Sequence, residues 1–278
     1  MKALKYILAL GLFVTGLTSC VKEPPTQEEI EAKWPETINT STYGEFVLVK
    51  RDTLGFTMGD ASLATSSPEH TVKFSKSYYM CTTEVTQAQW KSIMQVNPSD
   101  NEGLIKEGTN ADNCPVNNIT IDDAKLFVEA LNLQTGRKFA IPTEAQWEWA
   151  AMGGMNSTGY KFSGSNNLSD VAWTQANSDG YLNEVGKLAP NELGIYDMTG
   201  NVEEWTADKY ATYSSSEVTD PKGGKTGSDY AVRGGHSYEN DEELLSIKSR
   251  IKVKGNNKTY IRGLRLILEE PLNTELLK

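Results

Sequence analysis

Helical periodicity ends in this chain at Gly153-Gly154, and that break limits the folds it can adopt. Residues 155–240 are rich in Gly, Asn, Ser and Asp and contain only short strand-like runs such as Ala231 to Arg233. A long irregular segment must be held by internal hydrogen bonds or by ions, and such segments often carry function. We therefore expect one domain whose second half is mostly loop.

The first half of the domain alternates between short strands and amphipathic helices. Three helices are predicted to begin at capping threonines, Thr86, Thr120 and Thr143. Short strands are expected at residues 46–49, 56–59, 70–74 and 78–80. Apolar residues recur at helical spacing and are expected to face the core: Trp90, Ile93, Met94, Ala124, Phe127, Val128, Leu131, Trp147, Ala150 and Ala151. This mixture predicts an α+β fold with little regular secondary structure.

Residues 1–19 have the pattern of a signal peptide rather than of a folded segment. A basic start precedes an apolar run at residues 6–17, which is shorter than the stretch of about 20 residues that spans a membrane. The run ends in the letters LTSC, which resemble a bacterial lipobox and imply acylation of the Cys20 thiol after cleavage. An ordinary secretory peptide with an incidental cysteine is the alternative.

An acylated Cys20 would anchor the mature protein to a membrane through lipid chains. Val21 beside it is typical of an outer-membrane destination in a Gram-negative cell, with the domain facing the periplasm or the cell surface. Residues 20–42 are rich in Pro, Glu, Gln and Thr, and we expect a flexible tether there. The domain is then expected at residues 43–270, followed by a tail at 271–278.

The charge of the chain limits its partners. Its formal net charge is −10 and its pI is about 4.9, which argues against nucleic acid or an anionic lipid surface as the ligand.

The turn-rich stretch from Asn191 to Trp205 is the strongest candidate for an ion site. Gly200 and Asn201 tolerate positive φ, so the chain can bend and aim Asp197, Glu204 and nearby carbonyls at one point. A hard cation such as Ca²⁺ needs such oxygen ligands. The alternative is that these polar groups only satisfy a buried turn.

The cysteines and histidines offer few catalytic candidates. Cys81 and Cys114 remain after Cys20, and they form either a disulfide or two separate buried thiols. His236 stands beside a Gly-Gly turn, where it is either a lone ligand or base or a hydrogen-bonded surface residue.

A series of short motifs runs along the domain in a fixed order: Thr83 to Thr86, Pro115 to Ile119, Ile141 to Ala151, Gly153-Gly154, Asn191 to Trp205, Val232 to Gly235, Arg250, and Arg262 to Leu266. Together these motifs resemble the formylglycine-generating enzyme family, also called the sulfatase-modifying factor domain. The resemblance covers nearly all of residues 43–270. It implies the family's variant of the C-type-lectin-like fold, in one domain.

The resemblance also implies an activity whose residues are missing here. The family's enzymes oxidise a cysteine of a sulfatase to formylglycine with oxygen and copper, which a cysteine pair holds between the Arg-Gly-Gly and Gly-Phe-Arg-like motifs. Thiolates are needed because soft ligands hold copper(I). The matching interval, His236 to Arg250, contains no cysteine. Another member of the family uses iron held by a cluster of histidines. This chain has only two histidines, so that iron site is not present either. We therefore expect no copper and name no catalytic residue.

The family's calcium ligands, unlike its catalytic cysteines, have counterparts in this sequence. Residue by residue, the first site would consist of Asp197, the carbonyls of Gly200 and Val202, and Glu204. A second site would involve Asn177 and the carbonyl of Ser178, in a loop that is shorter here. Both ions would be structural.

Two functions from different classes follow from this resemblance. One is a non-catalytic, lipid-anchored binding or scaffold module for an envelope protein or a glycan. Family members of this kind occur as lipoproteins of gliding-motility and type IX secretion machinery. The other is an oxidoreductase of the formylglycine-generating type that acts on protein cysteine through an atypical site.

Overall fold

The computed structural model describes residues 25–40, 42–99 and 102–271. The predicted signal peptide, Cys20 and nearly all of the predicted tail lie outside the described residues. Within them, no helix has both the length and the apolar character required to cross a membrane.

The segment before residue 43 contains a helix and a strand, where a flexible tether was expected. Helix α1 covers Gln27–Glu31, and strand β1 covers Thr37–Thr40 and pairs antiparallel with β2, Gly44–Val49. Trp34 and Ile38 are buried in the core, and the Trp34 ring stacks on Tyr79 with 5.7 Å between ring centroids. Two large apolar side chains therefore anchor a segment whose composition is otherwise polar.

The three main helices lie where their capping threonines predicted. They are α2 (Gln87–Met94), α3 (Ile121–Thr135) and α4 (Glu144–Ala151), and each has a complete capping box. Thr86, Thr120 and Thr143 accept a hydrogen bond from the third backbone N–H of their helices, which removes an otherwise unpaired donor. Gly136 ends α3 in the left-handed conformation, as expected for a C-terminal glycine.

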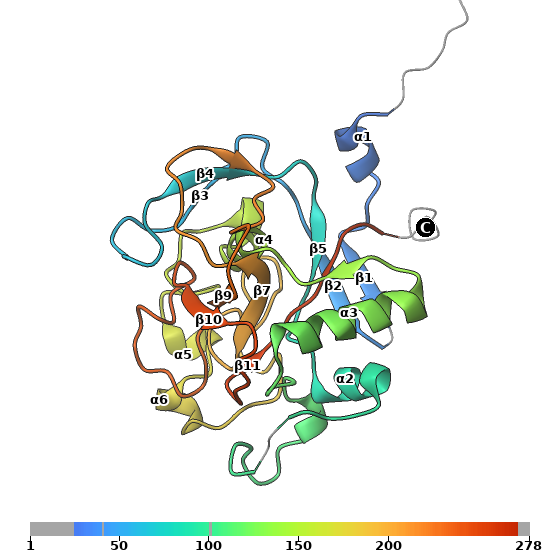
Figure 1. The fold of residues 1–278 in the computed structure, drawn as a ribbon, viewed down its shortest axis with the longest axis vertical. Coiled ribbons are helices and arrows are strands. Elements are labelled where there is room, and N and C mark those ends of the chain that lie inside the picture. The colour runs from blue at the N-terminus through green and yellow to red at the C-terminus, as the bar shows by residue number, and fades with distance from the viewer. Residues whose placement is uncertain (1–24, 41, 100–101, 272–278) are drawn as a thin grey trace, which may run out of the picture.

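Two larger sheets and one smaller sheet make up the rest of the domain (Figure 1). The five-stranded sheet has the order β1-β2-β5-β12-β6, the four-stranded sheet β10-β9-β7-β11 and the three-stranded sheet β3-β4-β8. Their further strands are β3 (Phe56–Met58), β4 (His70–Lys73), β5 (Tyr78–Cys81), β6 (Phe139–Ala140), β7 (Glu203–Lys209), β8 (Val218–Thr219), β9 (Asp229–Arg233), β10 (Ile251–Lys254), β11 (Arg262–Gly263) and β12 (Ile267–Leu268). The single-domain α+β prediction is confirmed.

The principal hydrophobic core lies between the two larger sheets and α3. Phe127 of α3 stacks on Trp90 of α2 at 4.7 Å, and the same cluster includes Trp205 and Val232 of the four-stranded sheet. A second cluster surrounds Trp147 and Trp149 of α4.

Between residues 152 and 202 the described chain forms only single turns: η2 (Gly154–Asn156), α5 (Leu168–Val171) and α6 (Gln175–Ser178). A further turn, η1, covers Ala111–Asn113.

Strand β7 was missed by the sequence analysis, which treated Glu203 and Glu204 as the end of a turn. Both glutamates are buried, and charged residues are rarely buried unless they are paired. Strand β11 lies parallel to β7 with Arg262 opposite Glu203, and Arg262 supplies the positive charge that makes the burial of Glu203 possible.

Candidate functional site

Glu204 is fully engaged by side chains from two other elements. Its Oε1 accepts hydrogen bonds from Arg265 Nη2 at 2.8 Å and Nε at 3.1 Å. Its Oε2 accepts from Trp147 Nε1 at 2.7 Å and from Arg265 Nε at 3.2 Å. A carboxylate has about four acceptor positions, so these contacts fill it.

Asp197 lies near Glu204 but is only half satisfied. Its Oδ2 accepts from the Gly186 backbone at 2.7 Å, whereas its buried Oδ1 has no hydrogen-bond donor among the described residues. Burial raises the pKa of Asp197 to about 6. The turn residue itself has a φ of 56°.

Glu84 is the third carboxyl of this cluster. Its Oε1 accepts from Asn201 Nδ2 at 3.1 Å, while its buried Oε2 finds no donor in the described chain. Burial, followed by repulsion from Asp197, raises the pKa of Glu84 well above its usual value. A neutral Glu84 can donate its proton to ionised Asp197. Each of the two otherwise unpaired oxygens then has a hydrogen-bond partner.

Two of the predicted calcium ligands, Asp197 and Glu204, are close enough to interact electrostatically, but not both are left free. The turn is built as predicted, since a Cβ on Gly200 would lie 2.2 Å from the Trp173 carbonyl and only glycine fits there. Asp197 Oδ1 can accept either a cation or the proton of a neutral Glu84, because it is a buried oxygen with no other donor among the described residues. Glu204 does not, because Arg265 and Trp147 occupy it. The described residues hold no group of three or more His, Cys, Asp or Glu side chains arranged for a metal ion. The calcium site stays a prediction.

Asn177 and Ser178, predicted for a second ion, cap and close helix α6. Asn177 Oδ1 accepts from the Thr174 backbone and its Nδ2 donates to the Ala172 carbonyl, both at 2.8 Å. The Ser178 carbonyl accepts from the Tyr181 backbone at 2.9 Å. These groups serve the loop's own hydrogen bonding, so an ion here also stays a prediction.

The segment 236–250, where the family places its catalytic cysteines, is anchored at both ends. The Ser237 backbone donates to the Asn201 carbonyl at 3.0 Å, and Leu245 is fully buried. Between these anchors, residues 240–243 form an exposed acidic loop that includes Asp241 and Glu242.

His236 lies in a pocket of acidic groups at the start of this segment. Its Nδ1 accepts from the Tyr238 backbone at 3.2 Å, so a neutral ring carries its proton on Nε2. Nε2 lies 3.9 Å from both Glu203 Oε1 and Glu239 Oε2. Burial lowers the pKa of His236. Because neither nitrogen of the neutral ring is a free acceptor, His236 is not arranged as a general base.

Exposed aromatic side chains border the acidic loop. Tyr238 and Tyr260 meet edge to face at 5.6 Å, and they are 36% and 42% exposed. Leu244 is 37% exposed on the same segment. We call Tyr238, Glu239, Leu244 and Tyr260 the loop face.

The two described cysteines are free thiols and do not form the disulfide that was one alternative. They are buried in different hydrophobic clusters. Burial raises the pKa of the Cys81 thiol and raises that of Cys114 to about 12. Copper held by a cysteine pair needs two thiolates together, so the residues present do not fit it.

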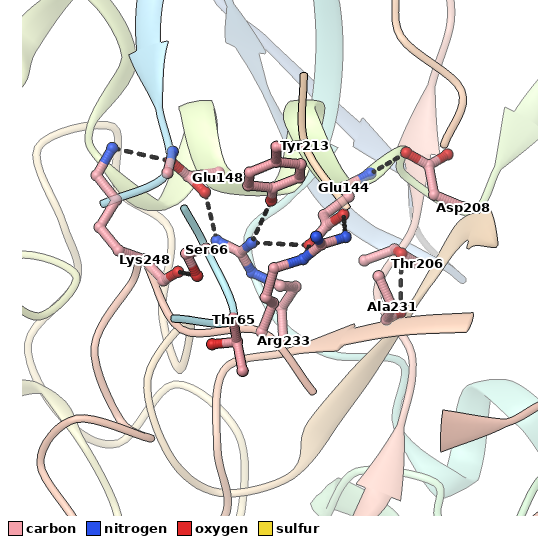
Figure 2. Close-up of polar contacts among 12 residues, drawn as sticks. Thr65, Ser66, Glu144, Glu148, Thr206, Asp208, Tyr213, Ala231, Arg233 and Lys248 are labelled. Atoms are coloured by element: carbon pink, nitrogen blue, oxygen red, sulfur yellow. Dashed lines mark hydrogen bonds and ion pairs between the residues drawn. The ribbon is translucent and has the colours of Figure 1, made fainter. Parts of the chain in front are cut away.

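A second ionic cluster, which the sequence analysis did not identify, joins α4 to β9 (Figure 2). Arg233 donates to Glu148 at 2.6 Å and to Glu144 at 3.0 Å, and Arg250 binds both oxygens of Glu144. Lys248 reaches Glu148 at 2.8 Å. Most of these residues lie in the recognised motifs, but only the fold shows which acid meets which base.

Comparison with known proteins supports the family resemblance. A family model described as the sulfatase-modifying factor enzyme 1-like domain matches residues 31–270. The chaperone protein LppX of Paenibacillus barcinonensis is 30% identical over 192 residues, which cover 51% of this chain and 66% of that protein. The formylglycine-generating enzyme of Thermomonospora curvata is 32% identical over 153 residues, which cover 48% of each.

The fold has a solved counterpart as well. The structure of Treponema denticola variable protein 1 superposes with a TM-score of 0.76 at 26% identity, covering 84% of this chain and 99% of that one. The chain spans about half to two thirds of the two curated relatives. The family match begins at residue 31, in agreement with the ordered Trp34 and Ile38. The chain belongs to the sulfatase-modifying factor enzyme 1-like domain family.

Proposed function

We propose that this protein is a non-catalytic binding module of the cell envelope that holds an envelope protein or a glycan on its loop face. The proposal rests on which residues occupy segment 236–250. Where the family's enzymes have a copper-binding cysteine pair, this chain has His236, Glu239 and an acidic loop bordered by exposed tyrosines.

The chemistry of the neighbouring groups favours binding over oxidation. The two free thiols are buried, and thiols with a raised pKa are poor nucleophiles and poor metal ligands. Exposed tyrosines, in contrast, supply large contact areas at low entropic cost, which suits a recognition surface.

The anchor and the location belong to the same proposal. Cys20 would carry the lipid and hold the domain at the outer membrane, facing the periplasm or the surface. An assembly of the gliding-motility or type IX secretion kind is the setting we favour. The chaperone name of the LppX relative agrees with a protein-binding role for this domain.

Site-specific photo-cross-linking in intact cells tests the proposal. A photoreactive residue at Tyr238 or Tyr260 should capture a defined set of envelope components. The matched control is Leu133, which is 82% exposed on α3. If positions 238 and 260 capture nothing beyond what position 133 captures, the loop face is not the binding surface.

The alternative is an oxidoreductase of the formylglycine-generating type, which the similarity to the Thermomonospora curvata enzyme favours. The full chain would be incubated with copper, oxygen and a cysteine-bearing sulfatase peptide, and the product followed by mass spectrometry. Formylglycine formation that survives replacement of Cys81 and Cys114 by serine would establish an atypical site and overturn the non-catalytic proposal.

A further inference from the structure

Two hollows meet beside the amino end of α4, away from the loop face. One has a volume of about 370 Å³ and the other about 480 Å³, and Asp208, Pro221 and Lys222 line both. Both volumes fall within the range of about 300–1,000 Å³ that is typical of small-molecule sites. The shared residues place one carboxyl and one ammonium group at the junction.

Asp208 is buried but under-bonded at this junction. It is only 3% exposed, and its Oδ2 accepts one hydrogen bond, from the Glu144 backbone at 3.2 Å. Figure 2 shows its other oxygen turned away from the ionic cluster. No residue in the described part of the chain donates to that oxygen or forms an ion pair with Asp208. A buried carboxylate is costly without donors, so this oxygen is ready to accept one from a ligand.

The other charges that line the smaller hollow are already used. Arg250 directs its donors to Glu144 and to the Ala211 carbonyl, and its guanidinium lies over the Tyr210 and Tyr213 rings at 4.1 and 4.0 Å. Glu144 is shared by Arg233 and Arg250. These groups already bind one another. Asp208 is therefore the carboxyl that remains to accept a hydrogen bond from a ligand.

Lys222 supplies the complementary donor. It is exposed and forms no ion pair among the described residues. The side chains of Thr212, Ser214 and Thr219 add hydroxyl groups to the lining of the smaller hollow.

We propose that these joined hollows bind one residue of a neutral saccharide. A hydroxyl group can donate to Asp208 and a neighbouring hydroxyl can accept from Lys222, since hydroxyls serve both roles. At the junction one carboxyl and one ammonium balance each other, and the larger hollow adds Lys76 against Asp220 and Glu269. Charges of both signs therefore line the hollows, which favours a neutral ligand.

Other ligand classes fit less well. A phosphate at the junction would lie beside the carboxyl of Asp208, and Arg250 has no donor to spare for it, so Lys222 would have to offset that repulsion. An organic cation would meet Lys222 at the junction and Arg250 in the smaller hollow. The proposal goes beyond the proposed function, because the site is separate from the loop face and holds whether or not that face binds a partner.

Ligand-observed saturation-transfer NMR tests the inference on the full chain in detergent. N-acetylglucosamine and methyl glucoside are the probes, with inorganic phosphate and methylammonium as the competing classes. We expect saturable binding of a saccharide probe with a dissociation constant on the order of 1 mM. Asp208→Asn and Lys222→Met should each weaken it by about tenfold.

The variants separate binding from folding. Lys222 is exposed, so Lys222→Met should leave the fold intact even if Asp208→Asn disturbs the start of α4. Lys106→Met is the matched control, since Lys106 is an exposed lysine that lines neither hollow, and it should bind like the unaltered protein. The inference is overturned if neither saccharide gives a signal, if Lys222→Met binds as tightly as the unaltered protein, or if only phosphate or methylammonium binds.

Discussion

Arg265 lies along both oxygens of Glu204, with 2.8 Å between Nη2 and Oε1 and 3.2 Å between Nε and Oε2. Both side chains are almost fully buried, and Arg265 also donates to the carbonyls of Cys81 and Tyr196. One guanidinium thus joins strand β7, the end of β5 and the turn that carries Asp197. Arg265 thereby balances the buried charge of Glu204.

Replacing Arg265 should therefore be among the most destabilising single changes. Arg265→Met leaves Glu204 buried without its partner, and breaking a buried pair in this way costs roughly 3–5 kcal/mol. Urea denaturation followed by tryptophan fluorescence measures the loss.

Two further variants check the cause. Adding Glu204→Gln to Arg265→Met should restore part of the stability, because the uncompensated charge is removed. Lys50→Ala breaks an exposed pair with Glu36, whose side chains are 55% and 73% exposed, and should cost less than about 1 kcal/mol. Equal effects of Arg265→Met and Lys50→Ala would contradict the assigned role.

Trp34 gives a second prediction, about where the domain begins. Because it is buried and stacked on Tyr79, Trp34→Ala should lose roughly 3–5 kcal/mol of folding free energy. Glu28→Ala, in the exposed helix α1, should change it by no more than about 0.5 kcal/mol. If a chain that begins at residue 43 melts at the same temperature as one that begins at residue 25, the first segment is a tether after all.

Local signals in the sequence were enough to locate the three main helices, α2, α3 and α4. Thr86, Thr120 and Thr143 each stand directly before apolar residues at helical spacing, and capping is decided within one turn of the chain. The β1 segment was missed because Trp34 and Ile38 are isolated among polar residues. Their burial depends on Tyr79 and other residues far along the chain.

The candidate site was only partly predictable for the same reason. The motifs locate Asp197 and Glu204 close together in the sequence, and the structure places Asp197 in the turn and Glu204 in strand β7. That Glu204 pairs with Arg265, and that Glu84 faces Asp197, depends on strand pairings between distant segments. No local spacing encodes these contacts.

Calcium provides a third prediction. Glu84 and Asp197 repel each other in the folded protein and each has one buried oxygen without a donor among the described residues, so we expect Ca²⁺ to bind at Asp197 and stabilise the fold. At 100 times its dissociation constant an ion adds about 2.7 kcal/mol. Differential scanning calorimetry with Ca²⁺ or with EGTA should show a higher melting temperature with the ion.

The effect should disappear in Asp197→Ala and persist in Asp179→Ala, which changes the neighbouring loop around Asn177 and Ser178. Mg²⁺ at the same concentration should stabilise less, since it retains its waters and demands a stricter geometry. An unchanged melting temperature in Ca²⁺ would mean that Arg265 and a protonated Glu84 balance this cluster without an ion.

The last prediction concerns pH and Asp208. Burial, followed by repulsion from Glu144, raises the pKa of Asp208 to about 7 in the folded state, above its unfolded value of about 3.9. A raised carboxyl pKa means that the folded state holds the proton more tightly. This contribution to stability is therefore full below the unfolded pKa and is lost as the pH rises through about 7. Between pH 5 and pH 8 the loss should be on the order of 2 kcal/mol.

Urea denaturation at pH 5 and pH 8 measures this slope, and Asp208→Asn should reduce it because the amide does not titrate. The exposed Asp122 is the matched control, and Asp122→Asn should leave the slope unchanged. The pKa of Glu148 lies outside this pH range. Burial raises it, but attraction to Arg233 and Lys248 holds it below the ordinary value of 4.5. A slope that Asp208→Asn leaves unaltered would show that Asp208 is already ionised at pH 5. The attraction of Arg250 and Lys222 would then keep Asp208 ionised at neutral pH.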